Sequence, residues 1–148
     1  MSIKEIIQVL AGFVGSLGFA VLFNIRGKKL IAASGGGMIS WLLFLLLTKF
    51  IDSEVVAYFI VASTVSMYAE VMARLLKTPP TTFIITSLIP MIPGSSLYYT
   101  MVSVFRFDDS EFLQKATYTM ELAAALALGV VLVTTLARIL EKIKKHQI

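Results

Sequence analysis

The sequence has no cysteine and only one histidine, His146, which lies in its last few residues. The lack of cysteine excludes disulfides, thiolate metal sites and cysteine nucleophiles. The position of the histidine leaves no histidine-based metal cluster or catalytic dyad among the apolar segments. Motifs such as His-Glu-x-x-His and Gly-x-Ser-x-Gly are also missing. We therefore expect no enzyme activity, no catalytic residues, no bound metal and no cofactor.

Charge is also scarce. Only 15% of the 148 residues are charged and 57% are hydrophobic, whereas soluble domains are about 25% charged and about 45–50% apolar. The mean hydropathy is +0.87. The net charge of +4 comes mainly from short segments between apolar blocks, which is typical of topology signals and not of nucleic-acid binding. Residues 1–148 are predicted to form a single integral membrane domain.

The apolar residues fall into five blocks of roughly twenty residues, each long enough to cross a hydrocarbon core about 30 Å thick. The first block has no small-residue cleavage site after it and is predicted to remain uncleaved. The predicted fold is all-α, a polytopic membrane protein with about five transmembrane helices. The spans cover residues 6–23, 30–50, 55–76, 83–105 and 116–136, with a charged connection at 106–115 and a basic tail at 137–148.

Lysine and arginine are unevenly divided between alternate loops. The first loop, the third loop and the tail hold nine of them, whereas the N-terminus, the second loop and the fourth connection hold four. Basic loops face the cytoplasm. We therefore expect a multi-pass protein of the cytoplasmic (inner) membrane, with its N-terminus outside and its C-terminus in the cytoplasm.

The fourth block is interrupted by Pro90, Pro93 and Gly94. We expect two half-helices here, because non-helical backbone within a membrane requires cover from protein or a watery cavity. The second half-helix would begin at Ser95 and Ser96 and would present free N–H groups to an anion such as a carboxylate. The alternative is an ordinary proline kink.

Two carboxylates, Glu70 and Glu121, lie within predicted spans, where ionisable residues are functional candidates. Ser66, Glu70 and Arg74 share a helical face with Ser63. Glu70 is therefore either a substrate or proton site or the partner of Arg74 in a structural ion pair. Glu121 lies about two turns from the outer end of its span, and its side chain either has a function or extends to the interface.

Tyr98 and Tyr99 follow the break, either as cavity lining or as part of the interfacial aromatic belt. Small residues recur on the first two blocks, which predicts close helix packing. A hinge is the alternative for the triple glycine, which lacks the lysine and strand of a phosphate-binding loop. The small residues are Ala11, Gly15 and Gly18 on one face of the first block, Gly12 and Ser16 on another, and Gly35, Gly36, Gly37 and Ser40 on the second block.

Three segments resemble the small five-span half of the threonine/serine exporter family, in an order and spacing that cover nearly the whole chain. They are GFAVLFN at 18–24, Ala69-Glu70 with Ala73-Arg74 and Lys77 before Pro79, and IPMIPG at 89–94 followed by the two tyrosines. The Pro-x-x-Pro-Gly segment is the most specific part. The resemblance implies secondary export of small amino acids or related carboxylates, and a separately encoded larger subunit as partner. It assigns no substrate-binding residue.

The favoured hypothesis is a transporter subunit in which the broken fourth block and the Ser63 to Arg74 face line a shared cavity with partner helices. The substrate would be a small zwitterion or carboxylate, and Glu70 would carry a proton. The alternatives are a non-transporting assembly subunit and a homo-oligomeric channel. The candidate substrate-binding residues are Ser66, Glu70, Arg74, Pro90, Pro93, Gly94, Ser95, Ser96, Tyr98 and Glu121.

Overall fold

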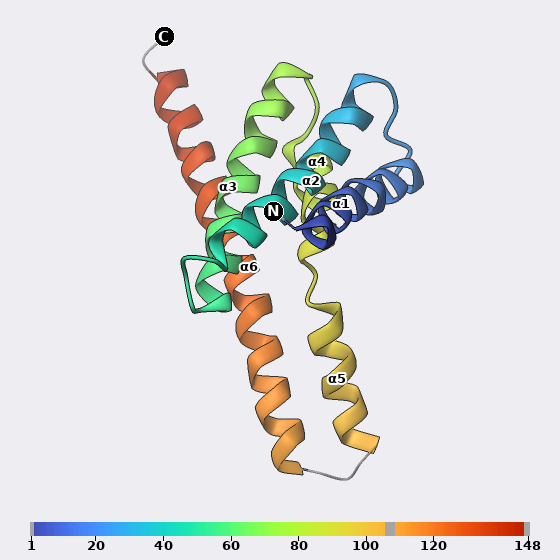
Figure 1. The fold of residues 1–148 in the computed structure, drawn as a ribbon. Helices are drawn as coiled ribbons and strands as arrows, with labels where there is room; N and C mark the ends of the chain where they lie inside the picture. Colours follow the sequence, from blue (N-terminus) through green and yellow to red (C-terminus); the bar gives the residue numbers. More distant parts are fainter. Residues whose placement is uncertain (1, 106–108, 147–148) are drawn as a thin grey trace.

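A computed structural model describes residues 2–105 and 109–146, and all the regular structure in these ranges is helical (Figure 1). The elements are α1 (Ile3–Leu22), α2 (Lys28–Leu47), α3 (Glu54–Leu75), α4 (Pro80–Leu88), the short 3₁₀ helix η1 (Ile89–Met91), α5 (Gly94–Phe105) and α6 (Asp109–His146).

Four helices, α1, α2, α3 and α6, are long and apolar enough to cross a membrane. Within the described residues, α4 with η1 followed by α5 forms a bent pair with an angle of 56° at the break, which counts as a fifth span if the pair crosses as one. The prediction of an all-α membrane protein with a broken fourth span is confirmed. The chain is a multi-pass membrane protein.

Local sequence explains where several helices begin. Ser2 caps α1 in a capping box, with its N–H donating to Glu5 Oε2 at 2.9 Å and its hydroxyl accepting from the Glu5 N–H. Ser53 caps α3 through the Val56 N–H. Pro80 stands in the first turn of α4, where its missing N–H costs nothing. The starts of α1, α3 and α4 thus follow from the local sequence.

Glycines let α2 pack closely against its neighbours. A Cβ atom at Gly37 would lie 1.8 Å from Ser16 Oγ of α1, and one at Gly36 would lie 1.9 Å from Ser87 Oγ of α4. Likewise, a Cβ at Gly129 of α6 would lie 2.8 Å from the Phe59 carbonyl oxygen of α3. The predicted close packing is confirmed at Gly36 and Gly37, whereas a Cβ at Gly35 would meet only the Tyr68 hydroxyl at 3.8 Å. Helix α2 runs through the triple glycine as one continuous helix.

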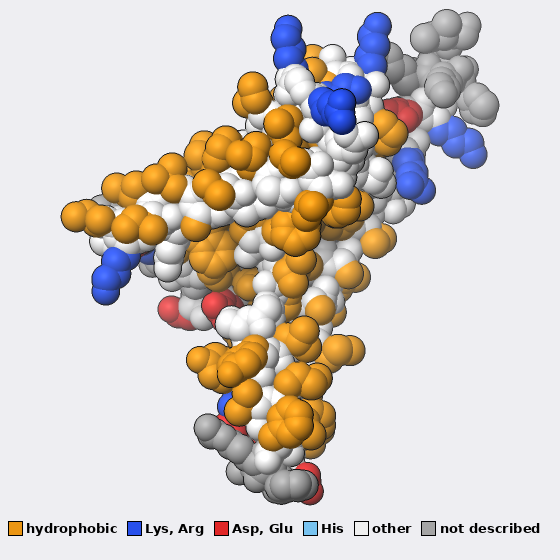
Figure 2. Space-filling view, turned by 90° about the vertical axis from the view of Figure 1, so that its right-hand side faces the viewer, with side chains coloured by type: hydrophobic (Ala, Val, Ile, Leu, Met, Phe, Trp, Pro, Cys, Tyr) orange, Lys and Arg blue, Asp and Glu red, His pale blue; other side chains and the backbone are white. Residues whose placement is uncertain are grey.

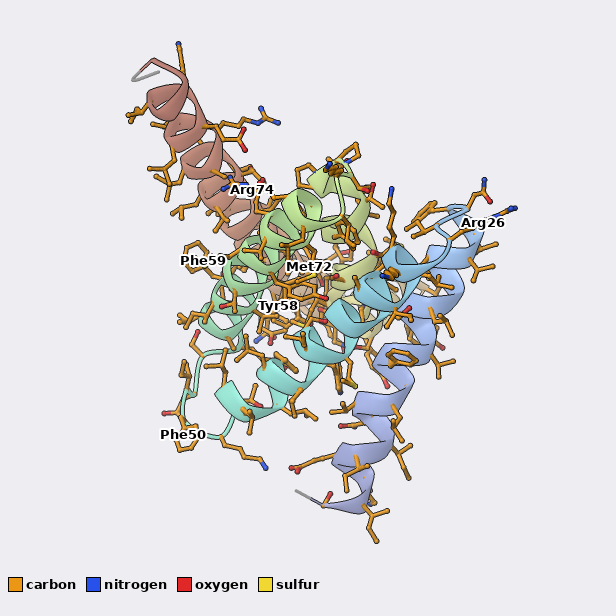
Figure 3. The ribbon with its side chains drawn as sticks, turned by 90° about the horizontal axis from the view of Figure 1, so that it is seen from above. Arg26, Phe50, Tyr58, Phe59, Met72 and Arg74 are labelled. Carbon is orange, nitrogen blue, oxygen red and sulfur yellow. The ribbon has the colours of Figure 1, made fainter. Side chains whose placement is uncertain are left out.

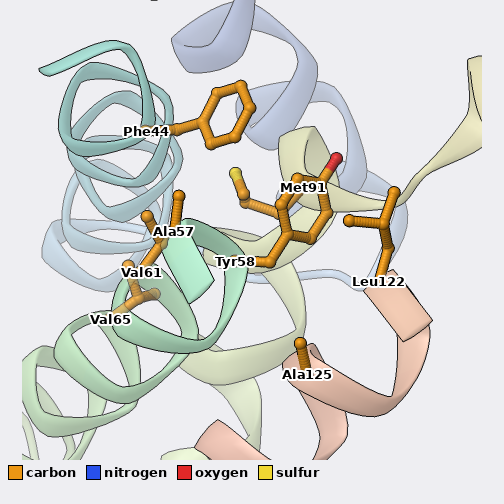
Figure 4. Close-up of a cluster of buried hydrophobic side chains, with 8 residues drawn as sticks. All are labelled: Phe44, Ala57, Tyr58, Val61, Val65, Met91, Leu122 and Ala125. Carbon is orange, nitrogen blue, oxygen red and sulfur yellow. The ribbon is translucent and has the colours of Figure 1, made fainter. Parts of the chain in front are cut away.

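Helices α3 and α6 run parallel and side by side (Figure 1). The Tyr118 hydroxyl of α6 donates a hydrogen bond to Glu54 at the start of α3, and Arg74 near the end of α3 pairs with Glu141 of α6. Between these ends, a buried cluster joins α2, α3, η1 and α6 (Figure 4). The cluster consists of Phe44, Ala57, Tyr58, Val61, Val65, Met91, Leu122 and Ala125.

Helix α6 extends beyond the predicted span at 116–136 at both ends, through part of the predicted connection before it and of the basic tail after it. Its 38 residues give a length of about 57 Å, almost twice the thickness of a hydrocarbon core. Asp109 and Glu111 lie in its first turn, where acidic residues stabilise a helix. The predicted connection at 106–115 is therefore helical from Asp109, and 106–108 lie outside the described residues. The first part of α6 pairs with α5 in a hairpin that projects from the bundle (Figure 1).

The chain ends and turns alternate between two ends of the bundle. At one end, Lys49 after α2 lies 3.0 Å from Glu5 at the start of α1. The α1–α2 turn, the α3–α4 turn and the end of α6 lie at the opposite end (Figure 1), and Lys and Arg side chains gather there (Figure 2). The loops that are rich in lysine and arginine therefore lie at one end of the bundle, and the loops with fewer lie at the other.

Candidate functional site

The break between η1 and α5 consists of Ile92 and Pro93. Ile92 is extended, with φ −62° and ψ 123°, and its N–H donates to the Ile89 carbonyl at 3.2 Å. The helix resumes when the Leu97 N–H donates to the Pro93 carbonyl at 3.0 Å. Pro90 and Pro93 have no N–H to continue the α-helical ladder, which explains the bend.

The break lies near one end of the bundle and not half-way along it. Met91, just before the break, packs in one cluster with Tyr58 of the second turn of α3 and with Leu122 of α6 (Figure 4). Residues 80–93 therefore run alongside most of α3. Beyond the break, α5 continues into the hairpin with α6.

A pocket of about 440 Å³ opens beside this break. We call it the α5 pocket. Three elements contribute to it: the start of α3, the break with the first turns of α5, and the early part of α6. It is lined by Glu54, Tyr58, Pro93, Ser95, Ser96, Tyr99, Lys115, Tyr118 and Leu122.

The α5 pocket contains groups of both charges. Lys115 pairs with Glu111 one turn earlier on α6, and its Nζ lies 5.6 Å from the centroid of the Tyr99 ring. Glu54 supplies a carboxylate and accepts a hydrogen bond from Tyr118. The first turn of α5 adds the positive end of a helix dipole. The pocket is thus suited to a small molecule with both an anionic and a cationic group.

Hydroxyl groups fix the register of α5 against α6. The oxygens of Ser96 and Thr119 are 2.7 Å apart, and those of Thr100 and Thr119 are 3.1 Å apart. Thr119 is nearly buried, and Thr100 is buried. These contacts hold the first turn of α5 at the pocket.

The structure separates the candidate residues around the break. Pro93, Ser95 and Ser96 line the α5 pocket. Pro90 lines a different pocket of about 260 Å³ that it shares with Gly12 of α1 and Trp41 of α2. A Cβ added at Gly94 would meet nothing within 4 Å, so a close contact does not require glycine there.

Tyr98 does not line the α5 pocket. Its side chain is exposed and packs edge-on against Tyr99, with ring centroids 5.4 Å apart. Tyr99 does line the pocket. Both tyrosines after the break are exposed, and only Tyr99 also lines the pocket.

Glu70 and Arg74 line a separate groove of about 510 Å³ between α3 and α6. We call it the α3–α6 groove. Its other walls are mainly aliphatic. Arg74 Nη2 lies 3.1 Å from Glu141 Oε1 and 3.8 Å from Glu70 Oε2, and the Glu70 side chain is only 14% exposed. Figure 3 shows Arg74 beside α6.

Ser66 and Glu121 lie elsewhere. Ser66 is fully buried, and its hydroxyl has no hydrogen-bond partner within the described residues. Glu121 is exposed and lines a hollow of about 850 Å³ along the early part of α6. Within this chain, the candidate residues therefore do not share one cavity.

Five residues that line the α5 pocket are not among the residues that the sequence points to: Glu54, Tyr58, Lys115, Tyr118 and Leu122. Glu54 and Lys115 each lie just outside an apolar block, in a predicted link between spans. One signal was available. Lys115, Tyr118 and Leu122 follow a spacing of three and then four residues, which places them on one face once the helix is known to begin before residue 116.

Membrane helices broken beside a polar pocket occur in secondary transporters. No group of three or more His, Asp or Glu side chains able to hold a metal ion occurs in residues 2–105 and 109–146. The family model described as "Threonine/Serine exporter, ThrE" matches residues 8–136. The chain belongs to this family of exporters, as its resemblance predicts. Comparisons with curated proteins and with solved structures gave no match.

Proposed function

We propose that this chain is the small subunit of a secondary transporter that exports threonine, serine or a related small carboxylate across the cytoplasmic membrane. The α5 pocket is the proposed substrate site. The observation that carries this assignment is the start of α5 in a pocket that also contains Lys115. Backbone N–H groups at a helix start and a nearby ammonium favour binding of a carboxylate.

A larger subunit is the proposed partner. Helix α6 has 38 residues and is about 57 Å long, so it cannot lie wholly within a hydrocarbon core about 30 Å thick. On the hairpin side, residues 109–115 precede the predicted span. Large apolar side chains are exposed along the hairpin (Figure 2), and one of them, Leu113 at 66%, lies outside the predicted spans at 83–105 and 116–136. Apolar surface outside the hydrocarbon region requires protein cover, which supports a partner on the hairpin.

The proposed orientation has the N-terminus outside and the C-terminus in the cytoplasm. The gathering of basic side chains at one end of the bundle (Figure 2) supports it through the positive-inside rule. In this orientation the α5 pocket lies towards the outer side. It would then hold substrate on the path by which an exported amino acid leaves.

Replacement of Lys115 by Gln tests the proposed site. The full chain is purified in mild detergent with the components that remain bound to it, and its thermal stabilisation by threonine, serine and a small dicarboxylate is measured. We expect Lys115→Gln to weaken binding about tenfold or more, because a charge-assisted contact to the carboxylate is worth roughly 1.5–3 kcal/mol.

Lys4→Gln is the matched control, because it removes a lysine of the same end of the molecule that does not line the pocket. It should bind like the parent. Equal binding by Lys115→Gln and the parent would show that the α5 pocket is not the site. No stabilisation of the parent by any of these ligands would contradict the proposed function itself.

A further inference from the structure

Among the described residues that line the α5 pocket, Glu54 is the only one with a carboxylate. It is the first residue of α3, where the helix dipole stabilises an anionic side chain. The Tyr118 hydroxyl donates a hydrogen bond to it from α6, and this contact orients the carboxylate. Glu54 is exposed and is therefore accessible to a ligand.

Aromatic rings accompany this carboxylate. Tyr58 lies one turn after Glu54 on α3 and is mostly buried, and Tyr118 contacts Glu54 directly. Both line the pocket. A carboxylate beside aromatic faces is a favourable environment for an ammonium group, through charge and through cation–π attraction.

We propose that Glu54 recognises the ammonium group of the substrate and makes the α5 pocket selective for amino acids over carboxylates of similar size. This inference rests on the proposed function, which assigns only the carboxylate end of the substrate and leaves amino acids and other carboxylates as alternatives. Tyr118 is a positioning residue that holds Glu54 through its hydroxyl.

Charge explains the selectivity. A zwitterion places its carboxylate near Lys115 and the start of α5, and its ammonium near Glu54. A dicarboxylate would bring a second anion to Glu54 and be repelled, whereas a monocarboxylate without the amine would leave Glu54 without its cation. Both mismatches discriminate against the wrong ligand.

Three related ligands test recognition of the ammonium group and of the carboxylate group independently. L-Threonine carries both charges, 3-hydroxybutyrate lacks the amine, and threoninol lacks the carboxylate. Binding to the full chain, purified with its bound components, is measured by thermal stabilisation. We expect the parent to prefer L-threonine to 3-hydroxybutyrate by about tenfold or more. A parent that binds both equally would overturn the inference without any variant.

Glu54→Gln should weaken binding of L-threonine and threoninol by about tenfold or more, and should leave 3-hydroxybutyrate binding the same or tighter. Gln retains an acceptor for Tyr118, so the local structure should persist. Glu54→Asp keeps the charge and should retain the preference for L-threonine. Asp52→Asn is the control, because it removes an exposed carboxylate two residues away that does not line the pocket.

The outcomes distinguish the two proposals. If the parent binds L-threonine and Glu54→Gln keeps the parent's ratio of L-threonine to 3-hydroxybutyrate affinity, the role of Glu54 is wrong and the proposed function stands. If the parent binds none of the three ligands, the proposed function fails and this inference fails with it. If Glu54→Gln lowers the melting temperature without ligand but leaves the ratio of L-threonine to 3-hydroxybutyrate affinity unchanged, the role of Glu54 is purely structural.

Discussion

Arg74 contacts two carboxylates, those of Glu70 and Glu141, and this limits the loss of stability expected when Glu70 is replaced. Its Nη2 atom is closer to Glu141 than to Glu70, at 3.1 Å against 3.8 Å, and its side chain is 55% exposed. Loss of one partner from a buried ion pair costs about 3–5 kcal/mol. Because Arg74 is exposed and keeps Glu141, we expect a much smaller cost here.

We predict that Glu70→Gln leaves the yield and the melting temperature of the purified protein nearly unchanged and removes most of its transport of threonine. Gln keeps the size and hydrogen bonding of Glu70 but cannot carry a charge or a titratable proton within the α3–α6 groove. The measurements are threonine export from cells and protein yield.

Glu141→Gln is the matched control, because it removes the other carboxylate of Arg74 and does not line the groove. It should export normally. Normal export by Glu70→Gln at normal yield would rule out a transport role for Glu70. A low yield would show that the carboxylate is structural.

At the scale of the elements, small residues on α1 fall into two classes that sequence periodicity does not distinguish. Gly12 and Ser16 are buried against α2, and the Cβ of any residue at Gly37 would collide with Ser16. A Cβ at Gly15 or Gly18 would meet nothing within 4 Å. Only the first class therefore sets the distance between helices.

We predict that Gly37→Ala destabilises the protein by about 1–3 kcal/mol, because the methyl group overpacks the contact between α1 and α2. Gly15→Ala should be neutral or stabilising by up to about 1 kcal/mol, since alanine favours the helix. Denaturant unfolding of the purified variants measures both. Equal stability of the two variants would contradict the close packing of α2 on α1.

The broken fourth span was predictable because proline acts locally. Two prolines within four residues remove two backbone donors, whatever surrounds them. The depth of the break was not predictable from this signal. It depends on Met91 packing beside Tyr58 and Leu122, which places the break near the start of α3.

At the scale of the whole molecule, the ends of the bundle differ in charge, and this difference predicts its orientation. Because the sequence has no cysteine, single cysteines can be introduced without background labelling. We predict that Asp52→Cys reacts with a membrane-impermeant thiol reagent in intact cells and that Lys142→Cys reacts only after the cells are opened. The reverse pattern would show that the N-terminus is cytoplasmic.

The sequence by itself determined the class of membrane protein, the five apolar blocks, the break and the family, because hydropathy, proline and short motifs are local properties. Tertiary structure decided which side chains meet. Glu54 and Lys115 lie at the edges of their apolar blocks, and Ser96 lies within the broken fourth block, so the three are far apart in sequence. They line one pocket because α6 begins well before its apolar block, runs parallel to α3, and holds α5 through Thr119. Helix length and register are set by packing between elements, so no local pattern could place these residues together.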